Sequence, residues 1–485
     1  MTVLSYFLPA SPEVCLVFAA LGATVAGLFS KGQRKAWLFS LTSLMLLAIA
    51  FGCFFLPGLR DVTFDGHFFN DSFSLFIKSI IALCAALLAL NLQSHLTFFK
   101  VKHFEFVVLL LCAVLGMFIL VSANDFLPAY IGLEIQSLAL YVMIGLFHEE
   151  KNVPEAVLKY FILGAVASCF ILFGISFIYG FSGTTNFNVL ESLLNNGAQS
   201  PLSLYLGIAF LLCGLAFKVS SFPFHMWTPD VYQGTPYPLL VLVSTAPKIA
   251  ALGFMMRLFL GPFYTEISTW QPLLMILAVA SMVFGAVASV MQGNVRRFLA
   301  YASISSIGFS LVGLAFANES GLRGSLFYTT LYIFSMIGFL TCVMILLRRG
   351  STIDKLSDLK GLATQRPFVA IAIAILVLTM SGLPPFPGFL GKLLLLQAAV
   401  GSEFYNVAIV MVLTTVITTY YYLNILKIMF FDGPVEPSIL THVSGKLGLN
   451  YLIVILSISL LTGLIFLPKY LLNWTNIAAS TLFYT

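Results

Sequence analysis

Fourteen stretches of mainly apolar residues follow one another along this 485-residue chain. Each has about 20 residues, the length that an α-helix needs to cross a lipid bilayer. We therefore predict an all-α polytopic membrane protein with about 14 transmembrane helices. The stretches lie near residues 13–30, 36–56, 72–94, 104–122, 125–147, 155–180, 202–222, 236–260, 271–293, 297–317, 323–347, 368–399, 404–430 and 449–471.

The scarcity of charge supports this prediction. Charged residues make up 9% of the chain and hydrophobic residues 60%, whereas about a quarter of a soluble domain is charged. The 24 Lys and Arg and 19 Asp and Glu residues are too few to cover a water-exposed surface of this size. Soluble enzymes, disordered chains and nucleic-acid-binding proteins are therefore excluded.

The sequence contains no recognisable cofactor motif. The seven cysteines occur singly, so we expect no iron–sulfur, haem-c or zinc site in this chain. Neither GxGxxG nor GxxxxGK[ST] is present, which argues against a nucleotide site. The N-terminus lacks a basic region and a small-residue cleavage site, so no cleaved signal peptide is expected. We expect other subunits to supply any redox or nucleotide chemistry.

Basic residues in the connections predict the orientation. One set of alternate connections holds sixteen Lys and Arg, and the other holds only Arg60, Arg323 and Lys469. By the positive-inside rule the richer set is cytoplasmic, so both termini are predicted to be periplasmic. The sixteen are Lys31, Arg34, Lys35, Lys100, Lys102, Lys151, Lys159, Arg296, Arg297, Arg348, Arg349, Lys355, Lys360, Arg366, Lys427 and Lys446.

Several charged residues fall inside the predicted spans. A charge at mid-membrane costs at least ~2.5–3.5 kcal/mol, so such residues usually face a protein interior or a water-filled path. Lys78 and Arg257 lie closer to span ends, and we expect their side chains to reach the interface by snorkelling. The deeper charged residues are Glu134, Lys218, Lys248 and Lys392.

Proline interrupts two of the predicted spans. Span 7 runs into FKVSSFPFHMWTPDVYQGTPYP, and span 12 contains SGLPPFPGFLGK. Proline lacks a backbone donor and breaks a helix, and an offset of five spans places the two breaks in opposite orientations. This pattern predicts two inverted five-helix repeats, as in many transporters. The predicted segments are 1–103 (helices 1–3), 104–260 (helices 4–8), 271–430 (helices 9–13) and 431–485 (helix 14).

These residues form a candidate proton path. Lys218 directly precedes the first break, Lys392 follows the second, and Lys248 lies in mid-span. Formation or loss of an ion pair between Glu134 and Lys218 would change how tightly the lysine holds its proton. An electrostatic change in a neighbouring subunit could thereby become proton release.

Three further polar residues lie near the first break and the start of span 6. Lys159 opens span 6, where snorkelling and proton uptake are equally plausible. His225 is expected to be a packed, hydrogen-bonded residue more often than a relay, although its pKa suits proton transfer. Asp230 is expected to bind backbone donors as a cap.

Longer motifs resemble a known family. The segments LAFKVSSFPFHMWTPDVYQGTP, STAPKIAALG and GLPPFPGFLGKLLLL resemble the N-type subunits of bacterial NADH:quinone oxidoreductase, respiratory complex I. IGLEIQSLALYVM, EAVLKYFILGAVASCFILFG and RRFLAYASISSIGFSLVGL fit in the same order, so the resemblance covers roughly residues 65–430. The chain is also similar to mitochondrial subunit 2, to the L- and M-type subunits and to Mrp-type antiporters.

The resemblance implies an antiporter-like proton channel in the membrane arm of complex I, in a bacterial inner membrane. The family's essential glutamate falls on Glu134 and its central lysines on Lys218 and Lys248. The exit lysine of span 12 falls on Lys392. The auxiliary positions fall on Lys159 and His225.

The resemblance also implies partners. No cofactor is expected in this chain, while FMN and iron–sulfur clusters would bind partner subunits. The neighbours would be an M-type antiporter-like subunit and small K- and J-type subunits, with lipids around them, the peripheral arm in indirect contact and quinone used by the complex. Related L- and M-type subunits often carry a histidine in span 10, where this chain has Ser306, so a relay there would need water.

Two other functions are compatible with these patterns. One is a stand-alone Na⁺(or K⁺)/H⁺ antiporter of the Mrp class, against which the N-like PFHMWTPDVY segment argues. The other is a membrane-arm scaffold that moves no protons. The scaffold predicts normal pumping when Lys218, Lys248 and Lys392 are neutralised.

Overall fold

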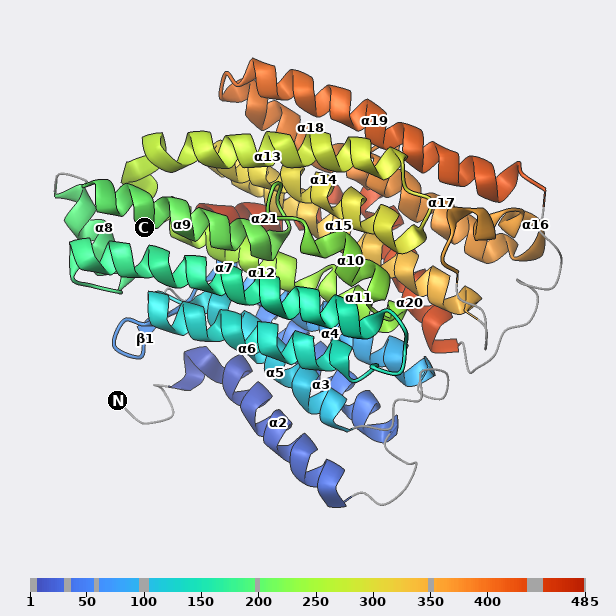
Figure 1. Cartoon of the computed structure of the whole chain (residues 1–485), viewed down its shortest axis with the longest axis horizontal. Helices are drawn as coiled ribbons and strands as arrows, with labels where there is room; N and C mark the ends of the chain where they lie inside the picture. The colour runs from blue at the N-terminus through green and yellow to red at the C-terminus, as the bar shows by residue number, and fades with distance from the viewer. Residues whose placement is uncertain are drawn as a thin grey trace.

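The computed structural model describes residues 7–29, 36–55, 61–95, 104–196, 201–347, 353–433 and 448–483. Figure 1 shows a single bundle in which most helices run along the same direction, with the first helices at the bottom and α18 and α19 at the top. The order is η1(Leu8–Ala10), α2(Ser11–Phe29), α3(Ala36–Phe55), β1(Asp61–Thr63), β2(Phe68–Asn70), α4(Ser72–His95), α5(Glu105–Ser122), α6(Phe126–Gly145), α7(Val153–Ser182), α8(Phe187–Asn195), α9(Leu202–Val219), α10(Trp227–Gly234), α11(Tyr237–Val243), α12(Ala246–Leu260), η2(Tyr264–Glu266), α13(Ile267–Val290), α14(Val295–Ala315), α15(Glu319–Leu346), η3(Leu356–Leu359), α16(Leu362–Gln365), α17(Pro367–Ser381), α18(Pro387–Gly401), α19(Tyr405–Phe430), α20(Gly448–Phe466) and α21(Pro468–Ser480).

The prediction of an all-α polytopic membrane protein is confirmed. Within the described ranges, 13 helices are long and apolar enough to cross a membrane. The two shorter apolar helices α17 and α18 follow each other at the place of predicted span 12. Each of the two is shorter than a full span, and the other thirteen predicted stretches match the thirteen candidate spans.

Glycines allow neighbouring helices to approach each other closely. A Cβ atom on Gly116 of α5 would lie 2.6 Å from the carbonyl oxygen of Gly132 on α6. A Cβ on Gly285 of α13 would lie 2.4 Å from the amide nitrogen of Ser305 on α14. Small residues drive helix packing in membranes because they permit such backbone contact, and they keep the bundle compact around the buried charges.

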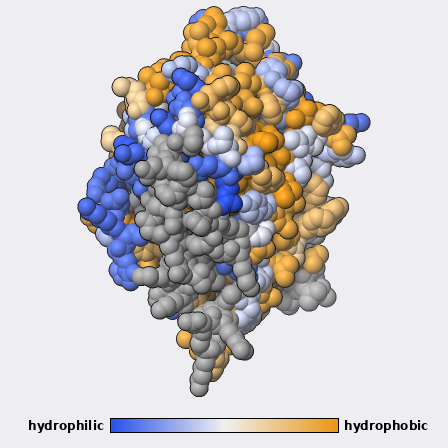
Figure 2. All heavy atoms as spheres, turned by 90° about the vertical axis from the view of Figure 1, so that its right-hand side faces the viewer, coloured by the Kyte–Doolittle hydropathy of each residue, from blue (hydrophilic) through white to orange (hydrophobic). Residues whose placement is uncertain are grey.

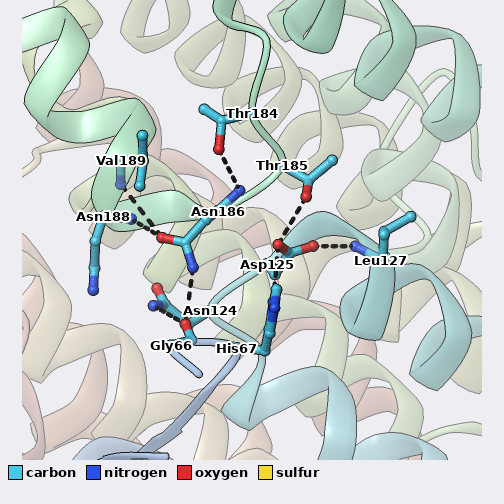
Figure 3. Close-up of polar contacts among 10 residues, drawn as sticks. All are labelled: Gly66, His67, Asn124, Asp125, Leu127, Thr184, Thr185, Asn186, Asn188 and Val189. Atoms are coloured by element: carbon cyan, nitrogen blue, oxygen red, sulfur yellow. Dashed lines mark hydrogen bonds and ion pairs between the residues drawn. The ribbon is translucent and has the colours of Figure 1, made fainter. Parts of the chain in front are cut away.

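A small β-hairpin was not predicted. Strands β1 and β2 pair antiparallel, and Gly66 and His67 lie between the paired residues. Figure 3 shows this tip against the loops that precede α6 and α8: the Asn124 and Asn186 amides donate to the Gly66 carbonyl oxygen at 2.7 and 2.9 Å. His67 Nδ1 lies 3.1 Å from Asp125 Oδ2. The hairpin therefore contacts the N-terminal ends of α6 and α8.

Lys355, Lys360 and Arg366 lie around η3 and α16, and α16 is at the right of Figure 1. An isolated bridge joins Asn294, which precedes α14, to Lys355, which precedes η3. Figure 2 views the right-hand side of Figure 1 and shows hydrophilic residues gathered mainly on the left, with hydrophobic residues on the right and at the top. Other residues used to predict the orientation lie outside the described ranges: Lys31, Arg34, Lys35, Arg60, Lys100, Lys102, Arg348, Arg349 and Lys446.

Candidate functional site

Lys218 lies in the last turn of α9, directly before a helix break. α9 ends at Val219, and Ser220 takes a left-handed conformation with φ of 66°. The Lys218 side chain is buried, and its Nζ donates a hydrogen bond to Ser137 Oγ on α6 at 3.0 Å. The structure thus interrupts the helix after Lys218, where the prolines predict the interruption.

Glu134 lies one turn before Ser137 on α6. Its carboxylate accepts a hydrogen bond from Ser168 Oγ on α7. Among the ion pairs of the described residues, none joins Glu134 to Lys218. Residues three apart lie on the same face of a helix, and Ser137, which accepts from Lys218, donates its own hydroxyl to the Leu133 carbonyl oxygen at 2.7 Å. Among the described residues, the direct pair that we hypothesised between Glu134 and Lys218 is not formed.

Lys248 follows a second break that the sequence analysis missed. Span 8 was expected to be one helix over 236–260, but Ser244 and Thr245 separate α11 from α12. Pro247 occupies the first turn of α12, where its missing donor is tolerated and its ring prevents the preceding residues from continuing the helix. Proline in the STAPK segment was the available signal.

The ammonium of Lys248 has polar and aromatic neighbours. Nζ donates to Ser303 Oγ on α14 at 2.9 Å and lies 5.1 Å from the centroid of the Tyr232 ring. A cation over an aromatic face is attracted by the negative potential of the ring. A hydroxyl and a ring therefore surround this charge, which lies in a span whose most apolar window is completely buried.

Lys392 lies one turn into α18, after the break in span 12. Its Nζ donates to the carbonyl oxygen of Ser381, the last residue of α17, at 2.8 Å and to Thr418 Oγ1 at 3.2 Å. The Phe309 ring centroid lies 4.9 Å away. The side chain also lines a cavity of about 220 Å³ between α18 and α19.

The three lysines share one kind of environment. Lys218, Lys248 and Lys392 are 8%, 3% and 7% exposed, respectively. Each donates to a hydroxyl or a carbonyl, and no carboxylate of the described residues lies within 4.0 Å of any of them. A buried ammonium without a counter-charge is costly in its charged form, which is the condition that a proton carrier needs.

Asp230 is an ion-pair residue, so the expectation that it caps backbone donors is wrong. Its Oδ2 accepts from Lys159 Nζ of α7 at 2.7 Å, and its Oδ1 accepts from Arg297 Nη1 of α14 at 2.8 Å. Burial would raise the pKa of Asp230, but the hydrogen bonds and charges of Lys159 and Arg297 outweigh it and lower that pKa. Lys159 is partly exposed, as either of its two predicted roles requires.

His225 lies in the loop between α9 and α10. Its ring packs against the Phe222 and Phe284 rings, with centroids 5.4 and 4.6 Å away. The residue is buried, yet Nδ1 has no hydrogen-bond partner among the described residues. His225 is therefore packed as expected, but that nitrogen is left free for a water molecule. Ser306 is also buried and donates to the Ala302 carbonyl oxygen at 3.0 Å.

Lys78 and Arg257 do not snorkel, so that expectation is wrong for both. Lys78 Nζ lies 2.6 Å from Glu13 Oε1, and Arg257 Nη2 lies 2.8 Å from Asp71 Oδ1. Arg257 Nε also donates to the Val121 carbonyl oxygen at 3.0 Å. These buried pairs connect distant parts of the sequence, and nothing in the sequence alone indicates which helices are neighbours.

The part of the chain that the structure describes contains no group of three or more His, Cys, Asp or Glu side chains placed to hold a metal ion. Its seven cysteines are free. The polar groups that converge in the bundle are instead lysines, hydroxyls, helix-end carbonyls and a few carboxylates. Such a set can bind and pass protons.

Comparison with known proteins identifies the family of this chain. Residues 123–418 match the family model described as NADH:quinone oxidoreductase/Mrp antiporter, transmembrane. The chain belongs to this family. The region that matches the NADH:quinone oxidoreductase/Mrp antiporter family contains Glu134, Lys218, Lys248 and Lys392. Glu13 and Lys78 both precede this region.

Individual relatives agree with this assignment. NADH-quinone oxidoreductase subunit N of Parvibaculum lavamentivorans is 41% identical over 438 residues, which cover 89% of each chain. The subunit of the same name from Rhodospirillum rubrum is 36% identical over 477 residues, covering 98% of this chain and 97% of the relative. A chain of respiratory complex I from Thermus thermophilus with bound aureothin superposes with a TM-score of 0.79 at 28% identity, over 95% of this chain and 98% of that one.

Proposed function

We propose that this chain is a proton-translocating membrane subunit of a bacterial NADH:quinone oxidoreductase, of the subunit N type. The observation that carries the proposal is the set of three buried lysines without a carboxylate within 4.0 Å among the described residues. Each sits beside a helix break inside the region matched by the family model. The subunit N relatives, similar over nearly the whole chain, support the same function.

The proton path runs along the middle of the bundle. Protons enter from the cytoplasm near Lys159 and reach Lys218, with His225 as an auxiliary group. They continue to Lys248 and leave near Lys392. Glu134 controls Lys218 through its charge, because it lies one turn before Ser137, the residue that accepts from the Lys218 ammonium.

The path spans two inverted repeats, residues 104–260 and 271–430. Two features support this division: breaks five spans apart, and a buried lysine beside each of them. In this arrangement residues 1–103 and 431–485 flank the repeats, and both termini face the periplasm of a bacterial inner membrane. The positive-inside rule supports this orientation.

The face of α6 around Glu134 is where a neighbouring subunit binds. Glu134 is only partly buried, and Ile131 and Leu138 beside it are 54% and 50% exposed. A carboxylate facing lipid is costly, whereas a polar group of a neighbouring membrane-arm subunit can satisfy it. M-type, K-type and J-type subunits are the candidate neighbours. FMN and iron–sulfur clusters belong to other partners, and the electron transfer that reduces quinone takes place there.

The test is proton pumping by the whole complex carrying Lys218→Ala. Inverted membrane vesicles report NADH oxidation and proton uptake together. We expect the variant to assemble and its rate of proton pumping to fall roughly tenfold, equivalent to a barrier higher by about 1.4 kcal/mol. Lys427→Ala, which removes an exposed lysine of α19, is the matched control and should pump normally.

Two results would contradict the proposal. Normal pumping by assembled Lys218→Ala, Lys248→Ala and Lys392→Ala complexes would make the chain a scaffold. Sodium-dependent proton exchange by the chain reconstituted alone, together with normal pumping by the complexes, would favour a stand-alone antiporter.

A further inference from the structure

Asp230 connects three helices at one end of the bundle. It lies on α10 and holds Lys159 of α7 at 2.7 Å and Arg297 of α14 at 2.8 Å, each on a different carboxylate oxygen. Arg297 Nη1 also donates to Gln233 Oε1 on α10 at 3.1 Å. We call Lys159, Asp230 and Arg297 the Asp230 clamp. The clamp fixes α10 between helices that lie in the two predicted repeats.

The helix that the clamp fixes is joined to the Lys218 region. Trp227, the first residue of α10, donates from Nε1 to the carbonyl oxygen of Phe217 at 2.9 Å. Its ring stacks on Tyr160, with centroids 4.6 Å apart and planes 13° apart. Because Phe217 directly precedes Lys218, movement of α10 would change the backbone next to that lysine.

The loop between Lys218 and α10 contains a buried titratable side chain. His225 is 8% exposed, and its Nδ1 lacks a hydrogen-bond partner among the described residues. Burying such a nitrogen without a partner is unfavourable. Water that reached this loop would satisfy His225 Nδ1 and stand close to the helix end that carries Lys218.

Lys159 has a second carboxylate within reach. Its Nζ lies 2.7 Å from Glu155 Oε1, the same distance as from Asp230 Oδ2. The Glu155 side chain is 71% exposed and that of Asp230 is 35% exposed. Lys159 therefore contacts both carboxylates at once. Ion pairs this accessible to water are individually weak, so Lys159 can release Asp230 at little cost while Glu155 still holds it.

We propose that Asp230 is a positioning residue that closes the cytoplasmic approach to Lys218, and that release of Lys159 from Asp230, while Glu155 still holds it, opens the approach. While the clamp holds, α10 stays against α7 and α14, and water is kept from His225. When Lys159 stays on Glu155 alone, this end of α10 loosens and water connects the cytoplasm to His225 and Lys218. The proposal rests on the proposed proton path and adds the device that controls its first step.

Hydrogen–deuterium exchange of the complete complex tests the proposal, followed in peptides that cover residues 220–234. In the wild type we expect these amides to exchange faster while NADH and quinone are turned over than at rest. Asp230→Asn should exchange fast in both conditions, by roughly two- to fivefold, which is the range that one partly exposed ion pair supplies. Asp230→Glu should restore the wild-type difference.

Glu155→Gln is the matched variant with the opposite expectation. It removes the other acceptor, so Lys159 stays on Asp230, exchange stays slow during turnover, and proton uptake per NADH falls. A purely structural Asp230 would also give faster exchange in Asp230→Asn, but the wild type would then show no turnover dependence and Glu155→Gln would have no effect. That outcome, or equal exchange at rest and in turnover in the wild type, would overturn the proposal.

Further variants keep the outcomes distinguishable. If Asp230→Asn does not assemble, Arg297→Gln releases the other arm of the clamp and should give the same fast exchange. Loss of pumping in Lys218→Ala together with no turnover dependence would leave the proton path standing and the clamp refuted. Normal pumping in the assembled Lys218, Lys248 and Lys392 variants would refute the path itself, whatever the exchange shows.

Discussion

The Lys78 ammonium of α4 lies 2.6 Å from a carboxylate oxygen of Glu13 on α2, and both residues are buried. The Phe68 and Phe118 rings lie 4.9 and 5.8 Å from the same ammonium. Removing one member of such a pair leaves an uncompensated charge and costs about 3–5 kcal/mol. We expect Lys78→Met to reduce the amount and melting temperature of the assembled complex.

The double variant Glu13→Gln, Lys78→Met is the control for that prediction. Replacing a whole buried pair by uncharged groups is often close to neutral, so the double variant should recover most of the lost stability. Equal stability of the single and double variants would show that the pair does not hold α2 to α4. Proton uptake per NADH should stay normal in every assembled variant.

The position of the Lys392 side chain requires a glycine at residue 382. The φ of Gly382 is 78°, and a Cβ on it would lie 2.7 Å from Lys392 Cδ. Gly382→Ala should therefore displace the lysine from the Ser381 carbonyl and reduce the rate of proton pumping by about tenfold. Gly183→Ala is the matched control, because Gly183 has a φ of 67° and nothing within 4 Å of its Cβ position. It should show the backbone cost of about 1–2 kcal/mol without a pumping defect.

The Ser303 hydroxyl is the hydrogen-bond acceptor of Lys248. Loss of an acceptor from a buried charged group costs about 1.5–3 kcal/mol, so Ser303→Ala should slow pumping at least about tenfold. Ser303→Thr keeps the hydroxyl and should pump much faster than the alanine variant. Ser305→Ala changes a buried serine whose hydroxyl faces the Met282 carbonyl. A pumping loss of equal size in Ser305→Ala would contradict a specific role for Ser303.

Asp125 anchors the β-hairpin and starts α6. Its carboxylate accepts from the Leu127 amide at 2.8 Å and from Thr185 Oγ1 at 2.8 Å, and it faces His67. Asp125→Ala should cost about 1–3 kcal/mol, because buried donors lose their acceptor, and should speed hydrogen–deuterium exchange in residues 61–70. Asp65→Asn removes an exposed charge from the same hairpin and should leave exchange unchanged.

The stabilisation that Asp230 provides depends on pH in a defined direction. Its partners hold its pKa below the unfolded value of about 3.9. Its contribution is therefore complete above that value and is lost as the pH falls through the lower folded pKa. The difference in melting temperature between wild type and Asp230→Asn should be constant from roughly pH 5 to 8. A difference that shrinks within that window would show that Asp230 titrates there and is not held by the clamp.

Much of the architecture can be predicted from the sequence because the bilayer sets a length for every span. Each predicted stretch corresponds to one helix or, in spans 8 and 12, to two helices that follow each other. Prolines likewise indicate the break after Lys218. The break before Lys248 was not predicted, because Pro247 lies in the first turn of a helix. A lone proline in a sequence does not distinguish the start of a helix from a kink within one.

Pairing between distant residues cannot be predicted in the same way. Asp71 and Arg257 are 186 positions apart, and Lys159 and Asp230 are 71 apart. Each partner alone looks like a snorkelling or capping residue. Only the packing of α4 on α12 and of α7 on α10 brings the charges together. The β-hairpin could not be predicted either, because strands of three residues give too short a pattern to detect.

The contacts of Lys392 have a consequence for how its proton could leave. The Ser381 carbonyl oxygen can accept a hydrogen bond but cannot be protonated at ordinary pH, so it cannot trap the departing proton. The Thr418 hydroxyl can accept from an ammonium and, after rotating, donate to a neutral amine. The same two groups can therefore serve the lysine before and after it gives up its proton, and the protein need not rebuild the site between the two states.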